Sequence, residues 1–283
     1  MLNINSTTMP KQNRLFQYDF IRAIAMLYVI AVHSLVVIDF TDPTSYNYFL
    51  IMQAVFFTCN GMFFMMSGRF ALESATTTVK YYYKKFESII LPMLFFFALR
   101  TLYQSDFSTF SLGLFFKNYF INILGGLSGT EYWFLYVLIG NLFLAPLLAK
   151  AFNCFSTKEH ILFIVLGLLH HFFLTVCTIK QIPYNYVLVF SGWSFYFYLG
   201  YSAEKIFKKT HYLRLWLIGL HALLITTYLK YIGIVTFVHD VSPLFTLIVI
   251  AMYFLLYTVS SHVSDALKPV FCFLAKHSFS VFL

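Results

Sequence analysis

Apolar runs of span length recur along the whole chain and constrain its fold more than any other feature. Crossing a bilayer takes about 20 predominantly apolar residues in helical form. On that rule we expect helices near residues 19–39, 47–68, 86–104, 132–149, 160–178, 186–203, 213–230, 243–260 and 269–283. The sequence therefore predicts an all-α fold, a polytopic transmembrane helix bundle of about 9–10 spans.

The composition agrees with a membrane protein and argues against a soluble one. Hydrophobic residues make up 60% of the chain and charged residues only 11%, whereas about 25% of a soluble domain is charged. The net charge of +8 does not indicate nucleic-acid binding, because the basic residues form short clusters between the apolar runs. Such clusters are typical of the loops that set membrane topology.

Lysine and arginine positions predict the orientation of the bundle. If the N-terminus is cytoplasmic and successive helices alternate, 15 of the 19 basic residues fall at cytoplasmic helix ends. Cytoplasmic loops carry such an excess of Lys and Arg, whereas carboxylates follow no such rule. Residues 1–17 are then a cytoplasmic N-terminal segment.

Two stretches do not read as ordinary spans. The aromatic segment 107–125 would break the charge alternation if it crossed the membrane, so we expect 105–131 to be extracytoplasmic or interfacial. The last run, 269–283, offers only about 15 apolar residues, so we expect either an incomplete last helix or a chain that is a fragment. The whole chain, 1–283, is interpreted as a single transmembrane domain.

The first apolar helix, residues 18–35, carries three ionisable side chains: Asp19, Arg22 and His33. Charged groups at membrane depth are costly, so each needs a polar partner or a function. Eleven helical steps bring Arg22 and His33 to within about 20° of one face and separate them by roughly 16–17 Å. The predicted orientation places Arg22 near the cytoplasmic surface and His33 near the outer one.

These side chains have both chemical and structural interpretations. His33 could act as a general base on an acceptor hydroxyl, since an ordinary imidazole titrates close to neutral pH; it could also simply face lipid headgroups. The forked guanidinium of Arg22 could bind the phosphates of an anionic cofactor. Alternatively, Arg22 forms an i,i+3 salt bridge with Asp19 that anchors the helix end.

Further candidates lie at other helix ends. Arg69 follows MFFMMSG at the inner end of the second helix, where it could join an anion site or serve as a positive-inside anchor. Glu131 precedes an aromatic run at the outer mouth of the fourth helix and could orient His33 or bind sugar hydroxyls. Trp133, in that run, could stack on a sugar ring or belong to an interfacial aromatic belt.

The remaining polar residues have mainly structural interpretations. His170, His171 and His221 lie mid-span with no carboxylate nearby in sequence, which weakens a proton-relay or metal-site interpretation. The four cysteines lack metal-ligand spacing, and no metal is expected. Lys80, Lys84 and Lys85 are interpreted as juxtamembrane anchors, and Asn141 and Pro146 as packing and kink features.

Four stretches together resemble the acyltransferase-3 family of multispanning membrane acyltransferases. YDFIRAIAMLYVIAVHSL resembles the family's opening helix, with its R-x10-H spacing met by Arg22 and His33. FFMMSGRFAL (63–72) is similar to an aromatic-Ser-Gly signature, and EYWFLYVLIGNLFLAPLL (131–148) to a Trp-Phe-Leu helix with a downstream proline. The terminal SFSVFL resembles the start of the last conserved helix. The resemblance spans nearly the whole chain.

The resemblance implies a membrane O-acyltransferase that moves an acyl group, usually acetyl, from cytoplasmic acetyl-CoA to a hydroxyl of an extracytoplasmic glycan or lipid-linked saccharide. It implies a catalytic role for His33 with Arg22 as its partner, and places Arg69, Ser67 and Gly68 near the cofactor. Glu131 departs from the pattern, because many relatives carry histidine or another polar residue there.

Expected surroundings follow from the same resemblance. The location is a cell membrane, with a bacterial plasma membrane expected, and the partners are membrane lipids and the acceptor saccharide, with self-association left open. The rival interpretation is a transporter or flippase, which predicts polar residues near midplane on several helices. Outside the first helix such residues are few, which favours the acyltransferase.

Overall fold

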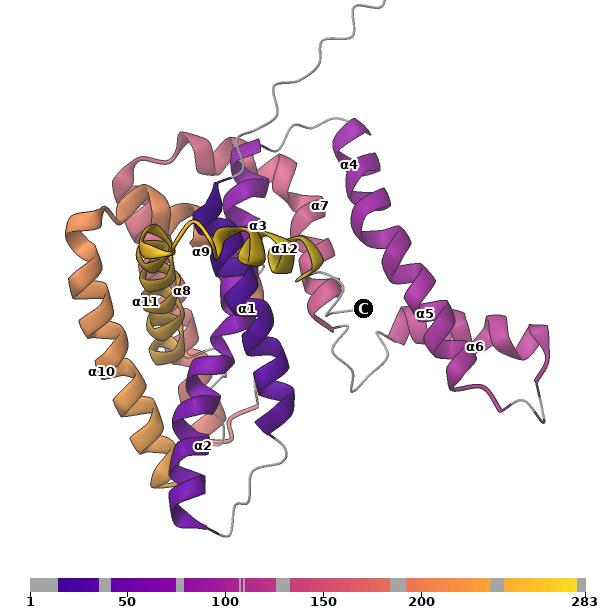
Figure 1. Ribbon diagram of the computed structural model, residues 1–283, viewed down its shortest axis with the longest axis horizontal. Coiled ribbons are helices and arrows are strands. Elements are labelled where there is room, and N and C mark those ends of the chain that lie inside the picture. The colour runs from indigo at the N-terminus through magenta and orange to yellow at the C-terminus, as the bar shows by residue number, and fades with distance from the viewer. Residues whose placement is uncertain are drawn as a thin grey trace, which may run out of the picture.

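The computed structural model describes residues 15–35, 42–74, 79–106, 108, 110–125, 133–183, 192–234 and 242–278. Within these residues every regular element is helical, which confirms the all-α prediction (Figure 1). The elements are α1 (Phe16–Ser34), α2 (Pro43–Phe56), α3 (Thr58–Ser74), α4 (Val79–Lys85), the π-helix η2 (Phe86–Ile90), α5 (Leu91–Tyr103), α6 (Leu112–Gly125), α7 (Trp133–Cys154), α8 (Thr157–Ile179), α9 (Trp193–Ile206), η3 (Lys209–His211), α10 (Tyr212–Tyr231), α11 (Pro243–Val259), η4 (Ser260–His262) and α12 (Lys268–His277).

Six helices in the described part of the chain are long and apolar enough to cross a membrane. One of them, Thr44–Glu73, runs 30 residues and joins α2 to α3 through a single turn residue, Phe57. Another, Val79–Tyr103, joins α4, η2 and α5. The other four coincide with α7, with α8, with η3 and α10, and with α11 and η4. Six of the nine predicted spans coincide with these helices. The other three predicted spans fall on α1, α9 and α12, which are not among the six.

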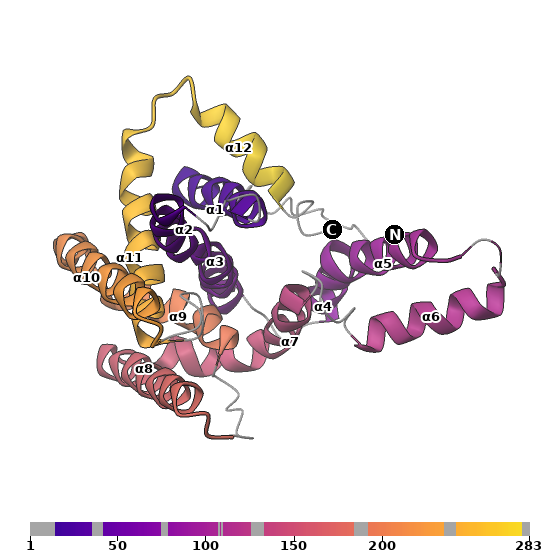
Figure 2. The same ribbon diagram turned by 90° about the horizontal axis from the view of Figure 1, so that it is seen from below.

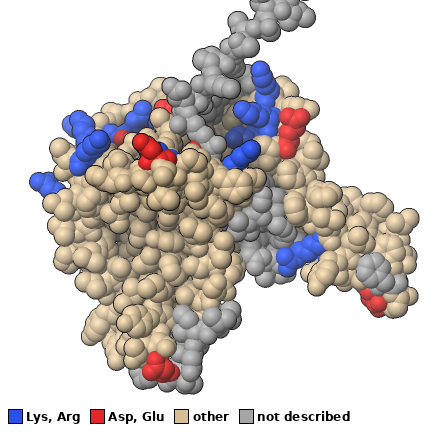
Figure 3. All heavy atoms as spheres, in the orientation of Figure 1, with Lys and Arg blue, Asp and Glu red and all other residues tan. Residues whose placement is uncertain are grey.

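Side-chain contacts give the relative directions of three helices: α1 runs opposite to α9, and α7 runs parallel to α9, as the predicted alternation requires. Tyr18 at the start of α1 contacts Glu204 at the end of α9, whereas Trp133 and Trp193, at the starts of α7 and α9, contact each other at a centroid distance of 5.4 Å. Most of the Lys and Arg side chains visible in Figure 3 gather at the end where α1 begins. By the positive-inside rule we take this as the cytoplasmic end.

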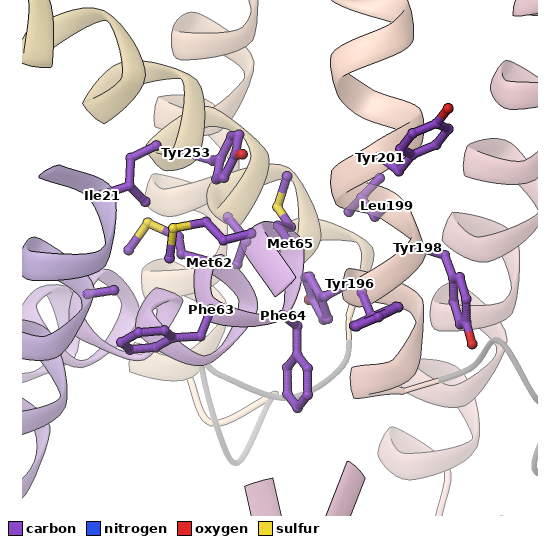
Figure 4. Packing of buried hydrophobic residues seen from close by; sticks show 14 of the residues in the cluster. Ile21, Met62, Phe63, Phe64, Met65, Tyr196, Tyr198, Leu199, Tyr201 and Tyr253 are labelled. Atoms are coloured by element: carbon purple, nitrogen blue, oxygen red, sulfur yellow. The ribbon is translucent and has the colours of Figure 1, made fainter. Parts of the chain in front are cut away.

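Helix α9 is the centre of the bundle. Every residue from Phe195 to Ala203 is buried, as expected for a helix that is apolar on all sides. Figure 2 shows α9 enclosed by α3, α7, α8 and α11. In Figure 4, Phe64 of α3 points to the same side as Tyr196 of α9, and the backbone of Met65 lies close to Gly200 of α9. The large side chains of α9 therefore supply the core on which the other helices pack.

Two glycines allow α3 and α9 to cross at very short range. A Cβ atom on Gly68 of α3 would overlap the carbonyl oxygen of Phe197, and a Cβ on Gly200 of α9 would overlap that of Met65. Small residues at helix crossings in membranes permit this kind of backbone contact. Arg69 directly follows Gly68, so the crossing also fixes where that guanidinium emerges.

The α4 helix is fastened to α7 through a proline. Pro146 has no N–H, so the carbonyl of Leu142, four residues earlier, loses its usual helical donor. The hydroxyl of Tyr81 donates to that carbonyl at 3.1 Å, and the hydroxyl of Tyr82 donates to the next one, on Phe143, at 3.2 Å. Two tyrosines of α4 thus satisfy the acceptors that the proline disturbs.

Helix α12 differs from the expected last span. Its described part is 10 residues long and packs against α1 at the periphery of the bundle (Figures 1 and 2). An apolar face contacts α1 through the rings of Phe271 and Phe20, 4.7 Å apart, while Lys268 and Lys276 occur near its two ends. Helices of this amphipathic, basic kind lie in the interface plane. Residues 279–283 of the expected span are outside the described residues.

Helix α6 lies within the segment that we expected to be extracytoplasmic or interfacial. It has 14 residues, fewer than a span needs. It packs against α5, where the Tyr119 hydroxyl donates to the carbonyl of Leu94 at 3.1 Å. The α6 helix is therefore an attachment to α5 rather than a further member of the central bundle.

The glycine crossing generates a stability prediction. Gly68→Ala or Gly200→Ala should lower the free energy of unfolding by about 2–3 kcal/mol or more, because the added methyl must push two backbones apart. Thermal unfolding of the purified protein in detergent measures this. Gly140→Ala, on α7 where a Cβ meets no atom within 4 Å, is the control and should change stability by no more than roughly 1 kcal/mol.

The proline contact generates a second prediction. Tyr81→Phe should destabilise the protein by roughly 0.5–1.5 kcal/mol, the value of one hydrogen bond to an otherwise unpaired carbonyl. In a Pro146→Ala background residue 146 regains its N–H, so the same substitution should cost close to nothing. Equal costs in both backgrounds would contradict the proposed pairing, and Tyr103→Phe, on an exposed side chain, is the neutral control.

Candidate functional site

The α1 helix carries Asp19, Arg22 and His33 on one uninterrupted run from Phe16 to Ser34. Asp19 is buried, Arg22 is half-buried and His33 is exposed in the last turn. An unbroken helix places Arg22 and His33 roughly 16–17 Å apart along its axis. The two side chains therefore lie toward opposite ends of α1, with Arg22 on the cytoplasmic side.

Asp19 lies at the junction of α1 and α12. Its side chain is 3% exposed, and the thiol of Cys272 approaches its Oδ2 atom at 3.7 Å. Asp19 also occupies the first turn of α1, where the helix dipole favours a negative charge. The contact with α12 adds a neighbour that the sequence pattern did not predict.

A second polar cluster joins four helices at the cytoplasmic end. The Nε atom of Arg69 on α3 donates to Glu204 on α9. Glu204 also accepts hydrogen bonds from the hydroxyls of Tyr18 on α1, at 2.9 Å, and Tyr253 on α11, at 2.6 Å. This Glu204 cluster therefore ties α1, α3, α9 and α11 together through one carboxylate.

The Glu204 cluster is shielded from solvent on its inner side. The side chains of Arg69 and Glu204 are 17% and 15% exposed. Burying an ion pair is costly unless its remaining polar atoms are hydrogen-bonded, and the two tyrosine hydroxyls meet that requirement for Glu204. Removing either Arg69 or Glu204 would leave the other charge unpaired in apolar surroundings. The contributions of the two residues to stability therefore depend strongly on each other.

Sequence reasoning found Arg69 but missed Glu204. Glu204 precedes Lys205 at the inner end of an expected helix and so looked like part of an ordinary charged boundary. The available signal was its place four residues after Gly200 on a helix that is otherwise apolar, because a carboxylate in such a helix needs a partner. The partner could not be identified without the α3–α9 crossing.

The other residues expected near the cofactor lie close to Arg69 but differ in setting. Ser67 is half-buried on α3 and directly precedes Gly68, the residue at the crossing. Gly68 faces the backbone of Phe197, and this contact accounts for a glycine there by packing alone. A role for either residue toward a cofactor stays a prediction.

The outer end presents an aromatic cluster. The indole of Trp133 lies 5.4 Å from that of Trp193, and Trp193 in turn lies 5.4 Å from the ring of Tyr196. Glu131 lies outside the residues that the structure describes, so its expected role stays a prediction. The structure thus joins Trp133 to α9 and places it at the same end of the bundle as His33.

Two of the mid-span histidines, His171 and His221, have structural partners. His171 Nδ1 lies 2.9 Å from the hydroxyl of Thr246, which also contacts the hydroxyl of Tyr196 at 3.0 Å. His221 Nδ1 lies 2.7 Å from the carbonyl of Leu217 on its own helix. These contacts link α8, α9 and α11 or act within α10, and they favour a packing role.

The architecture defines a class of protein before any comparison is made. A helical bundle with several span-length apolar helices, and with basic residues concentrated at one end, is a polytopic integral membrane protein. The family model for the acyltransferase domain of acyltransferase-3 proteins matches residues 15–283. The chain therefore belongs to the acyltransferase-3 family and is a membrane acyltransferase, which confirms the resemblance of its motifs. A search of curated proteins and one of solved structures found no significant match.

The Glu204 cluster generates a third prediction. Tyr253→Phe should lower the free energy of unfolding by roughly 1.5–3 kcal/mol, the value of a hydrogen bond to a charged group. Detergent-solubilised protein can be compared by thermal unfolding. Tyr228→Phe, on an exposed side chain of α10, serves as the control; equal effects of the two substitutions would argue against a special role for the cluster.

Proposed function

We propose that this acyltransferase moves an acetyl group from cytoplasmic acetyl-CoA to a hydroxyl of an extracytoplasmic glycan or lipid-linked saccharide. The observation that carries the proposal is the unbroken α1 helix, which holds Arg22 near the cytoplasmic end and His33 in its last turn. The setting we propose is the bacterial plasma membrane, with membrane lipids around the bundle.

The shape and charge of the donor suit this arrangement. CoA is an extended molecule with phosphates at one end and the thioester at the other. Phosphates held near Arg22 and a thioester delivered near His33 must be separated by roughly the 16–17 Å that eleven helical residues span. The guanidiniums of Arg22 and Arg69 are the side chains that we assign to the phosphates, because such groups bind phosphate oxygens in a bidentate way.

The proposed chemistry at the outer end is a direct acyl transfer. The hydroxyl oxygen of the acceptor attacks the thioester carbonyl as His33 removes the hydroxyl proton. A C–O bond forms, the C–S bond breaks, and the proton leaves with the sulfur as the free thiol of CoA. Arg22, with Asp19, belongs to the donor side of this scheme and takes no proton.

Recognition of the acceptor is assigned to the outer aromatic cluster. Trp133 and Trp193 offer adjacent indole rings, and an indole face can stack on the apolar face of a sugar ring. Glu131 is proposed to orient His33 or to accept hydrogen bonds from sugar hydroxyls. Both assignments concern the half of the protein where the saccharide is expected.

The proposal is tested at His33. His33→Ala should reduce acetyl transfer to cell-surface saccharide by a factor of about 100 or more, the usual contribution of a positioned general base. Labelled acetyl-CoA supplied to membrane vesicles, with label counted in the extracted saccharide, measures the transfer. Ser34→Ala is the matched control, since the Ser34 hydroxyl donates to the carbonyl of Ile30 on its own helix.

Unchanged labelling in the His33→Ala protein would overturn the assigned base. Absence of any acetyl-CoA-dependent labelling by the unaltered protein would overturn the proposed donor and acceptor. Movement of the saccharide across the membrane without acetyl-CoA would instead support a transporter.

A further inference from the structure

Arg69 bridges two carboxylates that differ sharply in setting. Its Nε atom pairs with Glu204, which is 15% exposed. Its Nη1 atom lies 2.5 Å from the carboxylate of Glu73, which is 48% exposed and one helical turn further along α3. The guanidinium therefore has a buried anion on its inner side and a solvent-facing anion on its outer side.

The inner contact, between Arg69 and Glu204, is stabilised by further hydrogen bonds. Glu204 is held by the hydroxyls of Tyr18 and Tyr253 as well as by Arg69. It also belongs to α9, whose neighbouring residues are buried. Charge-assisted hydrogen bonds in such surroundings are stronger than neutral ones, so Glu204 fixes the direction in which Arg69 points.

The outer contact, between Arg69 and Glu73, is the more easily exchanged of the two. Glu73 and Arg69 are an i,i+4 pair, and partly exposed pairs of this kind contribute little stability. Although the charges are close, Arg69 Nη1 is a buried atom that has no hydrogen bond of normal geometry within the described part of the chain. The Glu73 carboxylate thus covers a buried nitrogen of the guanidinium.

We propose that Glu73 is a built-in competitor of the acyl donor: its carboxylate occupies the outer side of Arg69 until a phosphate group of CoA displaces it. This inference rests on the proposed function, because it needs a polyanionic donor at the cytoplasmic end. Glu204 is then a positioning residue, which holds the guanidinium in place while its outer partner is exchanged. Displacement involves only the exchange of one anion for another, with no bond made or broken.

Such a competitor makes the site selective. A small anion with one or two charges gains little by replacing a carboxylate that is already in place. A donor that adds further phosphate contacts elsewhere can offset the lost ion pair. Glu73 therefore keeps a half-buried arginine from being occupied by free phosphate while leaving it available to CoA.

The inference is tested by measuring CoA binding to the purified full chain in detergent. Glu73→Gln keeps the size of the side chain and removes its charge, so it should tighten CoA binding roughly threefold to tenfold, as expected for an exposed ion pair that no longer has to be broken. It should also increase competition by inorganic phosphate. Asp265→Asn, which removes a carboxylate paired with Lys268 near the same end, should leave CoA binding unchanged.

Glu204→Gln, measured in the same CoA-binding experiment, should have the opposite effect to Glu73→Gln. Loss of the inner anchor should weaken CoA binding, and Glu204→Asp should restore part of the affinity. A merely structural role for Glu73 predicts weaker or unchanged CoA binding in Glu73→Gln, and either result would overturn the inference. Failure of the unaltered protein to bind CoA at all would instead overturn the proposed donor, and the inference with it.

Discussion

A single carboxylate, that of Glu204, is the constraint around which the cytoplasmic half of the protein is built. In an apolar bundle a carboxylate must be paired and hydrogen-bonded, and here the partners come from three other helices. The α3–α9 crossing at Gly68 and Gly200 brings the nearest partner, Arg69, into range. Packing at the glycines and pairing at the carboxylate therefore depend on each other.

Much of the fold could be predicted from the sequence because bilayer thickness dictates helix length and loop charge dictates direction. Six of the nine predicted spans match span-length helices, and the opposite directions of α1 and α9 agree with the predicted alternation. Those rules do not predict which helix lies at the centre. The central helix, α9, is only 14 residues long, and its position depends on its large rings, which fill the space between four neighbouring helices. The packing of α12 against α1 through Phe271 and Phe20 was not predicted either, because the length rule says nothing about which helices touch.

In the candidate site, too, some relations between residues could be predicted from the sequence and others could not. The spacing of Arg22 and His33 is a property of one helix, so the sequence alone could place them near opposite ends. The pairing of Arg69 with Glu204 joins residues 135 positions apart and depends on how two helices cross. Local periodicity predicts the first kind of relation and carries no information about the second. The outer aromatic cluster, which joins Trp133 to Trp193, belongs to the second kind as well.

The fastening of α4 to α7 has an evolutionary consequence. The carbonyl of Leu142 lacks a helical donor only because residue 146 is proline, and the Tyr81 hydroxyl is useful there only while that carbonyl stays free. Selection on the tyrosine thus depends on the proline, although 65 positions separate them in the chain. Among descendants of this sequence the two residues should be inherited as a pair: a lineage that loses Pro146 relaxes the requirement for Tyr81, and a lineage that loses Tyr81 first gains an advantage by replacing the proline.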